Sequence, residues 1–270
     1  MTLRNSRIKL SQGQVFWREI GQGPSLVFLH GSWSDSSQWL PIIEHLSQDY
    51  HCLALDLLGF GDSERPKLHY SIQVEVECLM EYLEALHLPS VYLVGHSLGG
   101  WIAASYALKY LEQVRGLVLI APEGVQAEGN RGSWQRTRWL VGRPPIAHTL
   151  LRALYPLARL MGRHKGIEQA LKQRQQLLSS PTACRLLFQR RRAEIQAELL
   201  QDNLDWLKVP TLIVQGGKDS PDAIARSKTY AERSPYAHLQ IIDQGGHDLP
   251  ETLPDLIARH IDDFVRRVEG

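Results

Sequence analysis

Cysteine is scarce in this chain, and long apolar runs are missing. Three cysteines, Cys52, Cys78 and Cys184, occur among 270 residues, far apart and in apolar surroundings. We therefore expect reduced core thiols in a reducing, cytoplasmic compartment, with neither a disulfide framework nor a metal site. The sequence has no run of about 18 apolar residues and no apolar h-region near its start, so we expect neither a membrane span nor a secretory signal.

Acidic residues are nearly absent from one long stretch. Between Arg131 and Arg192 the sequence holds twelve arginines and two lysines against one acid, Glu168, although the formal net charge of the whole chain is +1. The rest of the chain must therefore carry the compensating negative charge. Because the run 190–192 is short and no nucleic-acid motif accompanies it, we expect no nucleic-acid partner.

Outside that stretch, patterns of buried strands and amphipathic helices alternate. Two β-like runs around a turn, 7–10 and 15–20, predict an antiparallel hairpin. The alternation that follows predicts an α/β fold with a mainly parallel sheet and helices on both faces. The predicted strands are 25–29, 51–55, 91–94, 114–121, 210–215 and 238–242, and the predicted helices are 36–47, 71–87, 102–108, 222–233 and 253–268.

The alternation stops at Pro122. From there to about Asp205 the sequence is helical, basic and without a convincing strand pattern. We therefore expect one α/β core, residues 1–121 and 206–270, interrupted by a helical, arginine-rich cap or lid at 122–205. The sequence contains no repeat and no low-complexity tract.

A strand pattern runs directly into Gly95-His96-Ser97-Leu98-Gly99, and a helix pattern follows at once. This context is typical of the Gly-x-Ser-x-Gly nucleophile elbow. The turn strains the serine backbone, the glycines let strand and helix approach, and free N–H groups at the helix start lie beside an exposed hydroxyl. We predict that Ser97 is a nucleophile; the alternative is a serine that only caps the helix.

A serine hydroxyl needs a base, and the base needs an orienting carboxylate. His247 follows a strand in a Gly-Gly-His sequence, at the edge of the sheet where active sites gather, and is the predicted base. For His30 and His96 we expect loop structure and packing instead. Asp219, after the preceding strand, is the predicted orienting acid, with Glu123 as its main rival.

These motifs resemble those of the α/β-hydrolase fold family, in its lipase/esterase-like group with a helical cap. The resemblance covers nearly all of the chain outside the insertion, with the triad in the order Ser…Asp…His. It implies that the backbone N–H groups of Ser32 and Leu98 form an oxyanion hole, and that neither a metal nor an organic cofactor is needed. The matching segments are 30–31, 56–63, 95–100, 216–219 and 246–247.

The resemblance leaves the substrate open. It favours a serine hydrolase that cleaves carboxylic esters through an acyl-enzyme on Ser97, with a small-molecule ester as its partner, and the composition of the insertion adds the expectation that these esters are lipophilic. A serine at this position argues against the aspartate-dependent haloalkane dehalogenases and epoxide hydrolases of this fold. Thioesterases, carbon–carbon bond hydrolases, lyases and cofactor-free haloperoxidases remain alternatives, and so does a non-catalytic ligand-binding member. The oligomeric state is likewise open.

Bulky apolar residues are interleaved with arginines in the insertion, at 134–141 and 150–161. This composition suits a helix lying on an anionic membrane surface, where arginines meet headgroups and apolar side chains enter the interface. It also suits a lid whose arginines face water, or contact with an acidic protein. Peripheral contact of the basic cap with an anionic membrane or lipid is therefore one of three interpretations.

Overall fold

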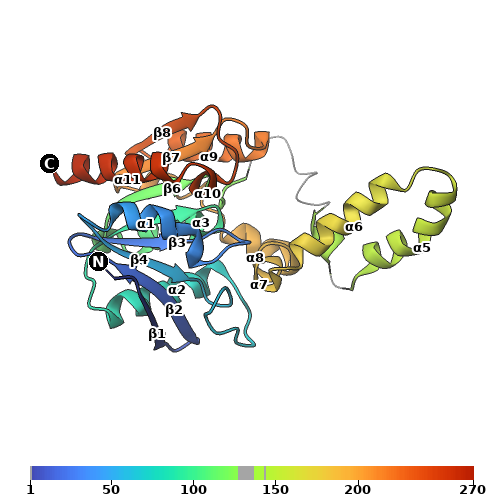
Figure 1. Cartoon of the computed structure of the whole chain (residues 1–270), viewed down its shortest axis with the longest axis horizontal. Coiled ribbons are helices and arrows are strands. Elements are labelled where there is room, and N and C mark those ends of the chain that lie inside the picture. Colours follow the sequence, from blue (N-terminus) through green and yellow to red (C-terminus); the bar gives the residue numbers. More distant parts are fainter. Residues whose placement is uncertain (1, 127–136, 143) are drawn as a thin grey trace. The chain divides into compact units, whose positions relative to one another are not determined.

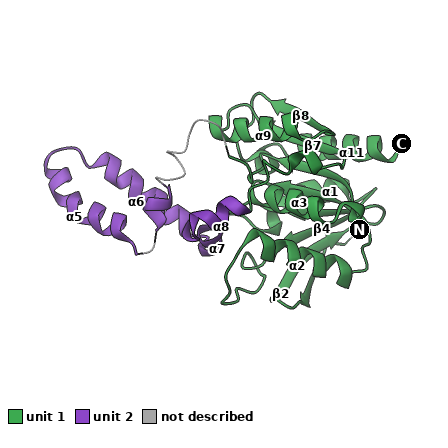
Figure 2. Ribbon diagram, turned by 180° about the vertical axis from the view of Figure 1, so that it is seen from behind, with its two compact units in different colours: residues 1–128, 198–270 green, residues 129–197 purple. Residues whose placement is uncertain are grey.

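The computed structural model of the chain describes residues 2–126, 137–142 and 144–270. These residues form two compact units, coloured separately in Figure 2. The first, here called the α/β unit, comprises residues 1–128 and 198–270. The second, here called the helical unit, comprises residues 129–197.

The α/β unit is organised around one sheet, which has eight strands within the described residues and the order β1-β2-β4-β3-β5-β6-β7-β8. β1 and β2 form the predicted antiparallel hairpin, β2 pairs antiparallel with β4, and all later pairs are parallel. The strands are β1 Arg4–Lys9, β2 Gln14–Ile20, β3 Ser25–Leu29, β4 His51–Asp56, β5 Val91–His96, β6 Val114–Ile120, β7 Thr211–Gly216 and β8 Ala237–Ile242.

Helices cover both faces of this sheet, which explains why its central strands are apolar throughout (Figure 1). α1 (Leu40–Leu46) and α11 (Pro254–Glu269) pack together and share one core cluster with β3, β5 and β6. α2 (Ile72–Ala85) and α3 (Leu98–Lys109) pack together on the opposite face, and α9 (Pro221–Arg233) contacts β7 and β8. The fold class expected from the sequence is therefore confirmed.

The carboxyl ends of the parallel strands meet at one edge of the sheet, and this edge positions the candidate site. β3, β5, β7 and β8 each end just before a residue singled out in the sequence. Fully buried side chains such as Leu26 and Phe28 hold these strands between the helix layers. Each such side chain contributes about 1.5–3 kcal/mol on burial, so the strand ends form a rigid support.

The helical unit contains a hairpin of two helices, α5 (Ile146–Leu160) and α6 (Lys165–Leu177), which turns at Gly162 with φ +69°. The Tyr155 hydroxyl donates a 2.6 Å hydrogen bond to the Glu168 carboxylate across this hairpin. Two short helices follow, α7 (Pro181–Cys184) and α8 (Arg192–Ala197), separated by a π-helical turn. Within the described residues of this unit the structure contains no strand, in keeping with the sequence pattern.

One face of α5 is apolar and exposed. We call this face the α5 stripe; its members are spaced by three or four residues, so they line up along the helix. Ala147 is the only buried residue of α5. The stripe consists of Ile146, Leu150, Leu154, Leu157 and the following Met161, which are 45–65% exposed.

The helical unit is shorter than the insertion expected at 122–205. Residues after 197 belong to the α/β unit because they hydrogen-bond to it. The Leu200 N–H donates to the Gly124 carbonyl oxygen at 2.8 Å, and the Trp101 indole N–H donates to the Glu198 carbonyl oxygen at 3.1 Å. Part of the apolar and arginine-rich run, residues 134–136, lies outside the described residues. Across the part of the chain that is described, each helix is too short or too polar to cross a bilayer.

Candidate active site

The turn between β5 and α3 places Ser97 in a conformation that side-chain-bearing residues rarely adopt. Its φ is +52° and its ψ is −110°, a backbone state that costs about 1–3 kcal/mol. The neighbouring glycines permit this turn because a Cβ atom on Gly95 would lie 2.4 Å from the Gly99 carbonyl oxygen. A Cβ atom on Gly99 would lie 2.1 Å from the carbonyl oxygen of Leu29, at the end of β3. Strand, turn and helix therefore meet as the sequence motif predicts.

The Ser97 side chain does not cap α3, although the residue occupies the N-cap position. Its backbone is held instead, since its N–H donates to the Ile120 carbonyl oxygen at 2.9 Å and its carbonyl accepts from the Glu123 N–H at 3.1 Å. The residue is 3% exposed, more buried than the elbow motif predicted. The turn after β3 lies close, because a Cβ atom on Gly31 would be 3.6 Å from the Ser97 Cβ.

The loop after β8 brings His247 to Asp219, which follows β7. The two side chains are joined by a contact of 2.8 Å between His247 Nδ1 and Asp219 Oδ2. With Asp219 ionised, Nδ1 carries the proton and donates it, which leaves Nε2 as the acceptor of the neutral ring. Asp219 is thus the carboxylate that contacts His247, whereas the contact of Glu123 with Ser97 is made by its backbone N–H.

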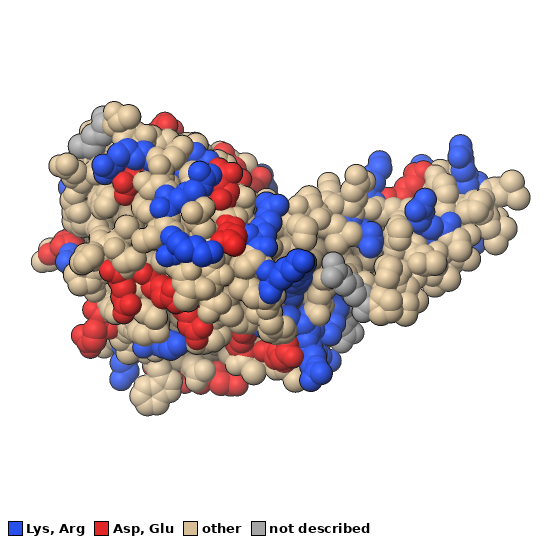
Figure 3. All heavy atoms as spheres, turned by 90° about the horizontal axis from the view of Figure 1, so that it is seen from below, with Lys and Arg blue, Asp and Glu red and all other residues tan. Residues whose placement is uncertain are grey.

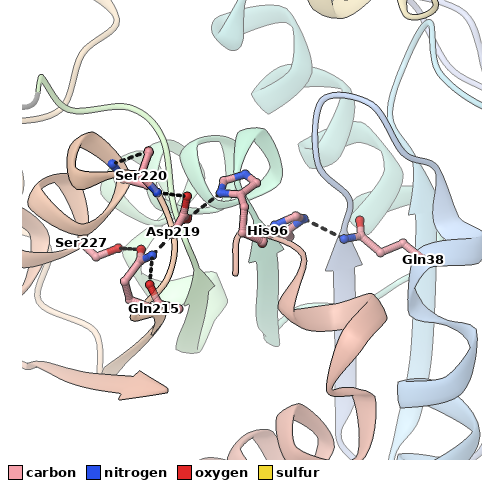
Figure 4. A network of polar contacts seen from close by, with 9 residues as sticks. Gln38, His96, Gln215, Asp219, Ser220 and Ser227 are labelled. Atoms are coloured by element: carbon pink, nitrogen blue, oxygen red, sulfur yellow. Dashed lines mark hydrogen bonds and ion pairs between the residues drawn. The ribbon is translucent and has the colours of Figure 1, made fainter. Parts of the chain in front are cut away.

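Two further groups fix the Asp219 carboxylate (Figure 4). The Ser220 N–H donates to Oδ1 at 2.6 Å, and Gln215 Nε2 donates to Oδ2 at 3.1 Å. Gln215, the fifth residue of β7, is fully buried and accepts at Oε1 from the Ser227 hydroxyl at 2.6 Å. The carboxylate therefore has its orientation set from β7 and α9. No sequence motif marks Gln215, and its position inside an otherwise apolar strand was the one available signal.

Charge and burial have opposite effects on the pKa values of His247 and Asp219. Burial opposes the charged form of His247, but the hydrogen bond and negative charge of Asp219 outweigh it and raise the pKa of His247 above 6.5. Burial likewise opposes ionisation of Asp219, yet the hydrogen bond from His247 and its positive charge lower the pKa of this carboxyl. His247 therefore accepts a proton more readily than a free imidazole does, with Asp219 stabilising the resulting charge.

The two predicted oxyanion donors come from the turns after β3 and β5. Leu98 is the first residue of α3, so its N–H has no acceptor within the helix. Ser32 follows the His30-Gly31 turn at the end of β3 and is 2% exposed. Its hydroxyl oxygen is buried and, among the residues that the structure describes, has no hydrogen-bond partner.

The other two histidines near the elbow have different surroundings. His30 stabilises its loop, as predicted, because its Nε2 accepts from the Leu57 N–H at 3.1 Å and its Nδ1 lies 2.8 Å from the Gly31 carbonyl oxygen. His96 is buried but does more than pack, since both ring nitrogens make hydrogen bonds. One of its partners, Gln38, was not singled out by the sequence, where no motif marks it.

The chemistry available at this strand edge is acyl transfer. It offers a hydroxyl on a strained turn, an imidazole oriented by a carboxylate, and backbone N–H groups at a helix start. Among the described residues, no cluster of three or more His, Cys, Asp or Glu side chains is arranged to hold a metal ion. Of the predicted residues, the structure brings His247 and Asp219 into contact and places Ser97 at positive φ in the turn after β5.

Comparison with known proteins agrees with this architecture. The family described as "alpha/beta hydrolase fold" matches residues 24–252. Monoacylglycerol lipase ABHD6 of Bos taurus is 27% identical over 261 residues, which cover 93% of this chain and 77% of that protein.

Solved structures share the fold. A bacterial membrane phospholipase A has a TM-score of 0.76 at 24% identity, with 99% of this chain and 87% of that chain covered. A thermophilic esterase from Thermogutta terrifontis has a TM-score of 0.74 at 22% identity, with 99% and 100% covered. Because the family match spans most of the sequence and the sheet has the corresponding strand order, the chain belongs to the alpha/beta hydrolase fold family.

Proposed function

We propose that the protein is a serine hydrolase that cleaves carboxylic esters, lipophilic ones above all, through an acyl-enzyme on Ser97. The observation that carries this proposal is the 2.8 Å contact between His247 and Asp219, and the positive φ of Ser97 in the turn after β5 supports it. The relative ABHD6, named a monoacylglycerol lipase, supports an ester as the substrate class. Neither a metal nor an organic cofactor takes part in the proposed reaction.

In the proposed mechanism, the Ser97 hydroxyl attacks the acyl carbonyl carbon while His247 Nε2 takes the hydroxyl proton. The N–H groups of Ser32 and Leu98 stabilise the negative charge that develops on the carbonyl oxygen. His247 then gives its proton to the leaving alcohol, and the acyl group remains on Ser97. Water, deprotonated by His247, attacks this ester, and collapse of the second intermediate releases the carboxylic acid and returns the proton to Ser97.

Covalent labelling tests the nucleophile directly. A fluorophosphonate is expected to label Ser97 at one equivalent, and the protein is expected to hydrolyse short p-nitrophenyl esters. Ser97→Ala should abolish labelling and lower kcat by about 10⁶-fold. Ser105→Ala is the matched control, because the Ser105 hydroxyl lies on the same helix and donates to the Trp101 carbonyl oxygen. A wild-type protein that is neither labelled nor active would contradict the proposal.

We also propose that the α5 stripe meets an anionic lipid surface. The stripe exposes five large apolar side chains on one face of α5, and residues 129–197 carry a formal net charge of +12. An exposed apolar helix face on a basic unit has the two properties that interfacial binding requires, buried apolar area and attraction to anionic headgroups. Each Lys or Arg near such a surface contributes about 1 kcal/mol.

Vesicle co-sedimentation tests this proposal. We expect the protein to sediment with vesicles that contain phosphatidylserine and much less with pure phosphatidylcholine. Leu154→Glu with Leu157→Glu should abolish sedimentation, whereas Leu111→Glu with Tyr236→Glu, which makes the same charge change at exposed positions of the α/β unit, should preserve most of it. Equal binding to both vesicle types, binding to neither, or a stripe-dependent dimer without lipid binding would overturn it.

A further inference from the structure

A chain of three buried or part-buried hydrogen bonds connects three segments at the carboxyl edge of the sheet, and Figure 4 shows its central bond, between Gln38 and His96. The Gly31 N–H donates to Gln38 Oε1 at 3.1 Å, in the turn after β3. Gln38 Nε2 lies 2.7 Å from His96 Nδ1, at the end of β5. His96 Nε2 lies 2.9 Å from the carbonyl oxygen of His247, in the loop after β8. We call these three hydrogen bonds the Gln38–His96 relay.

The donors and acceptors of the relay follow from its two ends. Because Gln38 Oε1 accepts from a backbone N–H, the amide nitrogen faces His96 and donates to Nδ1. Nδ1 is then unprotonated, so the proton of the neutral ring is on Nε2, which donates to the His247 carbonyl. Burial, with the nearby His247 charge as a smaller cause, lowers the pKa of His96 to about 3, so the ring stays neutral at ordinary pH.

Gln38 is itself held firmly. It lies in a short 3₁₀ helix, Ser36–Trp39, and is 6% exposed. The Ser36 N–H donates to the Asp56 carboxylate at 2.6 Å, and Trp39 is fully buried with its ring centroid 5.3 Å from that of Phe28. The glutamine is therefore fixed to β4 and β3, the rigid part of the sheet, and can serve as an anchor.

Each loop joined by the relay carries a group of the proposed reaction within one residue of the hydrogen bond. Gly31 precedes Ser32, His96 precedes Ser97, and the last acceptor is the backbone of His247 itself. The His247 side chain is 43% exposed, and the glycines Gly245 and Gly246 precede it. Packing alone therefore holds this loop less firmly than the strands, and the hydrogen bond from His96 supplies a fixed point.

We propose that Gln38 and His96 are positioning residues. They hold the His247 backbone, and the turn that carries Ser32, in the positions that the reaction at Ser97 requires. This inference rests on the proposed serine hydrolase function. The relay residues touch no substrate; they act through the residues that do. Because a displacement of about 1 Å in an active site can lower the rate about 100-fold, loss of the relay should act on kcat.

Gln38→Met tests the relay with little change in side-chain volume. We expect kcat for a p-nitrophenyl ester to fall about 10–100-fold with KM changed less than about 3-fold, since transition-state geometry rather than substrate binding is affected. The rate of labelling by a fluorophosphonate should fall in proportion. Gln113→Met is the matched control, because Gln113 accepts a hydrogen bond from the Tyr106 hydroxyl before the amino end of β6. It should leave kcat unchanged.

A second variant and the double variant separate a shared relay from two independent structural roles. His96→Leu should lower kcat about as much as Gln38→Met, and the double variant should be no worse than the more damaged single variant. Coupling of this kind is expected for residues in one hydrogen-bond chain. Unchanged kcat in either single variant, losses that multiply in the double variant, or an equal loss in Gln113→Met would overturn the inference.

Nitrogen-15 NMR of histidine-labelled protein adds a readout that does not depend on activity. We expect His96 near neutral pH to be a neutral ring protonated at Nε2, and Gln38→Met to change the Nδ1 resonance that reports the accepted hydrogen bond. A ring protonated at Nδ1 would overturn the relay even in an active enzyme. A wild-type protein that gives the expected ring signals but neither hydrolyses esters nor reacts with a fluorophosphonate would instead contradict the hydrolase proposal and the positioning role. The hydrogen bonds of the relay would still stand.

Discussion

The two units differ in charge and in the use that they make of apolar side chains. Residues 129–197 carry a formal net charge of +12, whereas residues 1–128 and 198–270 together carry −11. Figure 3 shows acidic side chains gathered on the rounded α/β unit, while basic side chains predominate on the helical unit. The α/β unit buries its strands β5 and β7 completely, whereas α5 buries only Ala147.

This difference indicates that the two units meet different requirements. The candidate site needs groups fixed within a fraction of an ångström, and the sheet with its two helix layers provides such a support. The side chains of the α5 stripe do not form a buried core in the helical unit. Apolar surface left in water lacks the stabilisation of about 25 cal/mol per Å² that burial would provide. Exposed stripes of this kind mark surfaces that bind something else. We therefore expect substitutions in the two units to have very different effects.

After Ser97→Ala, the largest effect is expected at Asp219. Asp219→Asn should lower kcat about 10⁴-fold, because an amide cannot fix the His247 tautomer or stabilise the imidazolium as the carboxylate does. Glu123→Gln is the control, since the contact of Glu123 with Ser97 uses its backbone. Ester hydrolysis measured for both variants decides between the two acids, and a loss confined to Glu123→Gln would assign the orienting role to Glu123.

The next effect concerns stability. Leu26→Ala removes a fully buried side chain from β3 and should lower the free energy of unfolding by about 2–5 kcal/mol. Urea unfolding followed by tryptophan fluorescence measures the change. A loss below about 1 kcal/mol would mean that the strand layer can relax around the cavity, in which case the contrast between the two units would be weaker than the structure indicates.

A smaller effect is expected in the pH dependence. His247 must be neutral to accept a proton, so kcat/KM should rise with pH through its pKa, which Asp219 holds above 6.5. The raised pKa also stabilises the fold, fully below 6.5 and progressively less as pH rises through the folded-state value. The rate profile of the wild type should have its midpoint above that value, and Asp219→Asn should lower the midpoint. A midpoint unaffected by this substitution would assign the titration to another group.

The smallest effect is expected on α5. Leu157 is 58% exposed, so Leu157→Ser should change the free energy of unfolding by no more than about 0.5 kcal/mol. The same urea titration measures it beside Leu26→Ala. A loss comparable with that of the buried leucine would show that the α5 stripe is covered in solution. It would contradict the contrast between the buried α/β unit and the exposed face of α5.

The sequence was sufficient for the fold and for the residues at the strand ends. Ser97, Asp219 and His247 each follow a strand pattern in a recognisable glycine-rich setting, and strand ends of a parallel sheet meet at one edge. The roles of the supporting glutamines, Gln38 and Gln215, could not be predicted from the sequence. Gln38 contacts a histidine 58 positions away, and a single sequence gives no indication of such a pairing.

Two other features also required the structure. The insertion was expected to continue to residue 205, but the hydrogen bond from Leu200 to Gly124 holds this segment in the α/β unit. The sequence showed apolar residues interleaved with arginines along α5, yet such a pattern does not reveal whether an apolar helix face is buried or exposed. Both depend on contacts between segments distant in the chain.

The three cysteines give the protein a practical property. All of them are buried, and burial raises the pKa of Cys52 to about 12 and that of Cys78 further still. Thiolates are the species that react with maleimides, so the native thiols should resist such reagents while the protein is folded. A single Leu160→Cys substitution, at a position 88% exposed at the end of α5, would then accept a fluorophore selectively. The unsubstituted protein can thus serve as the control for residual labelling of native thiols when the helical unit is studied by site-specific spectroscopy.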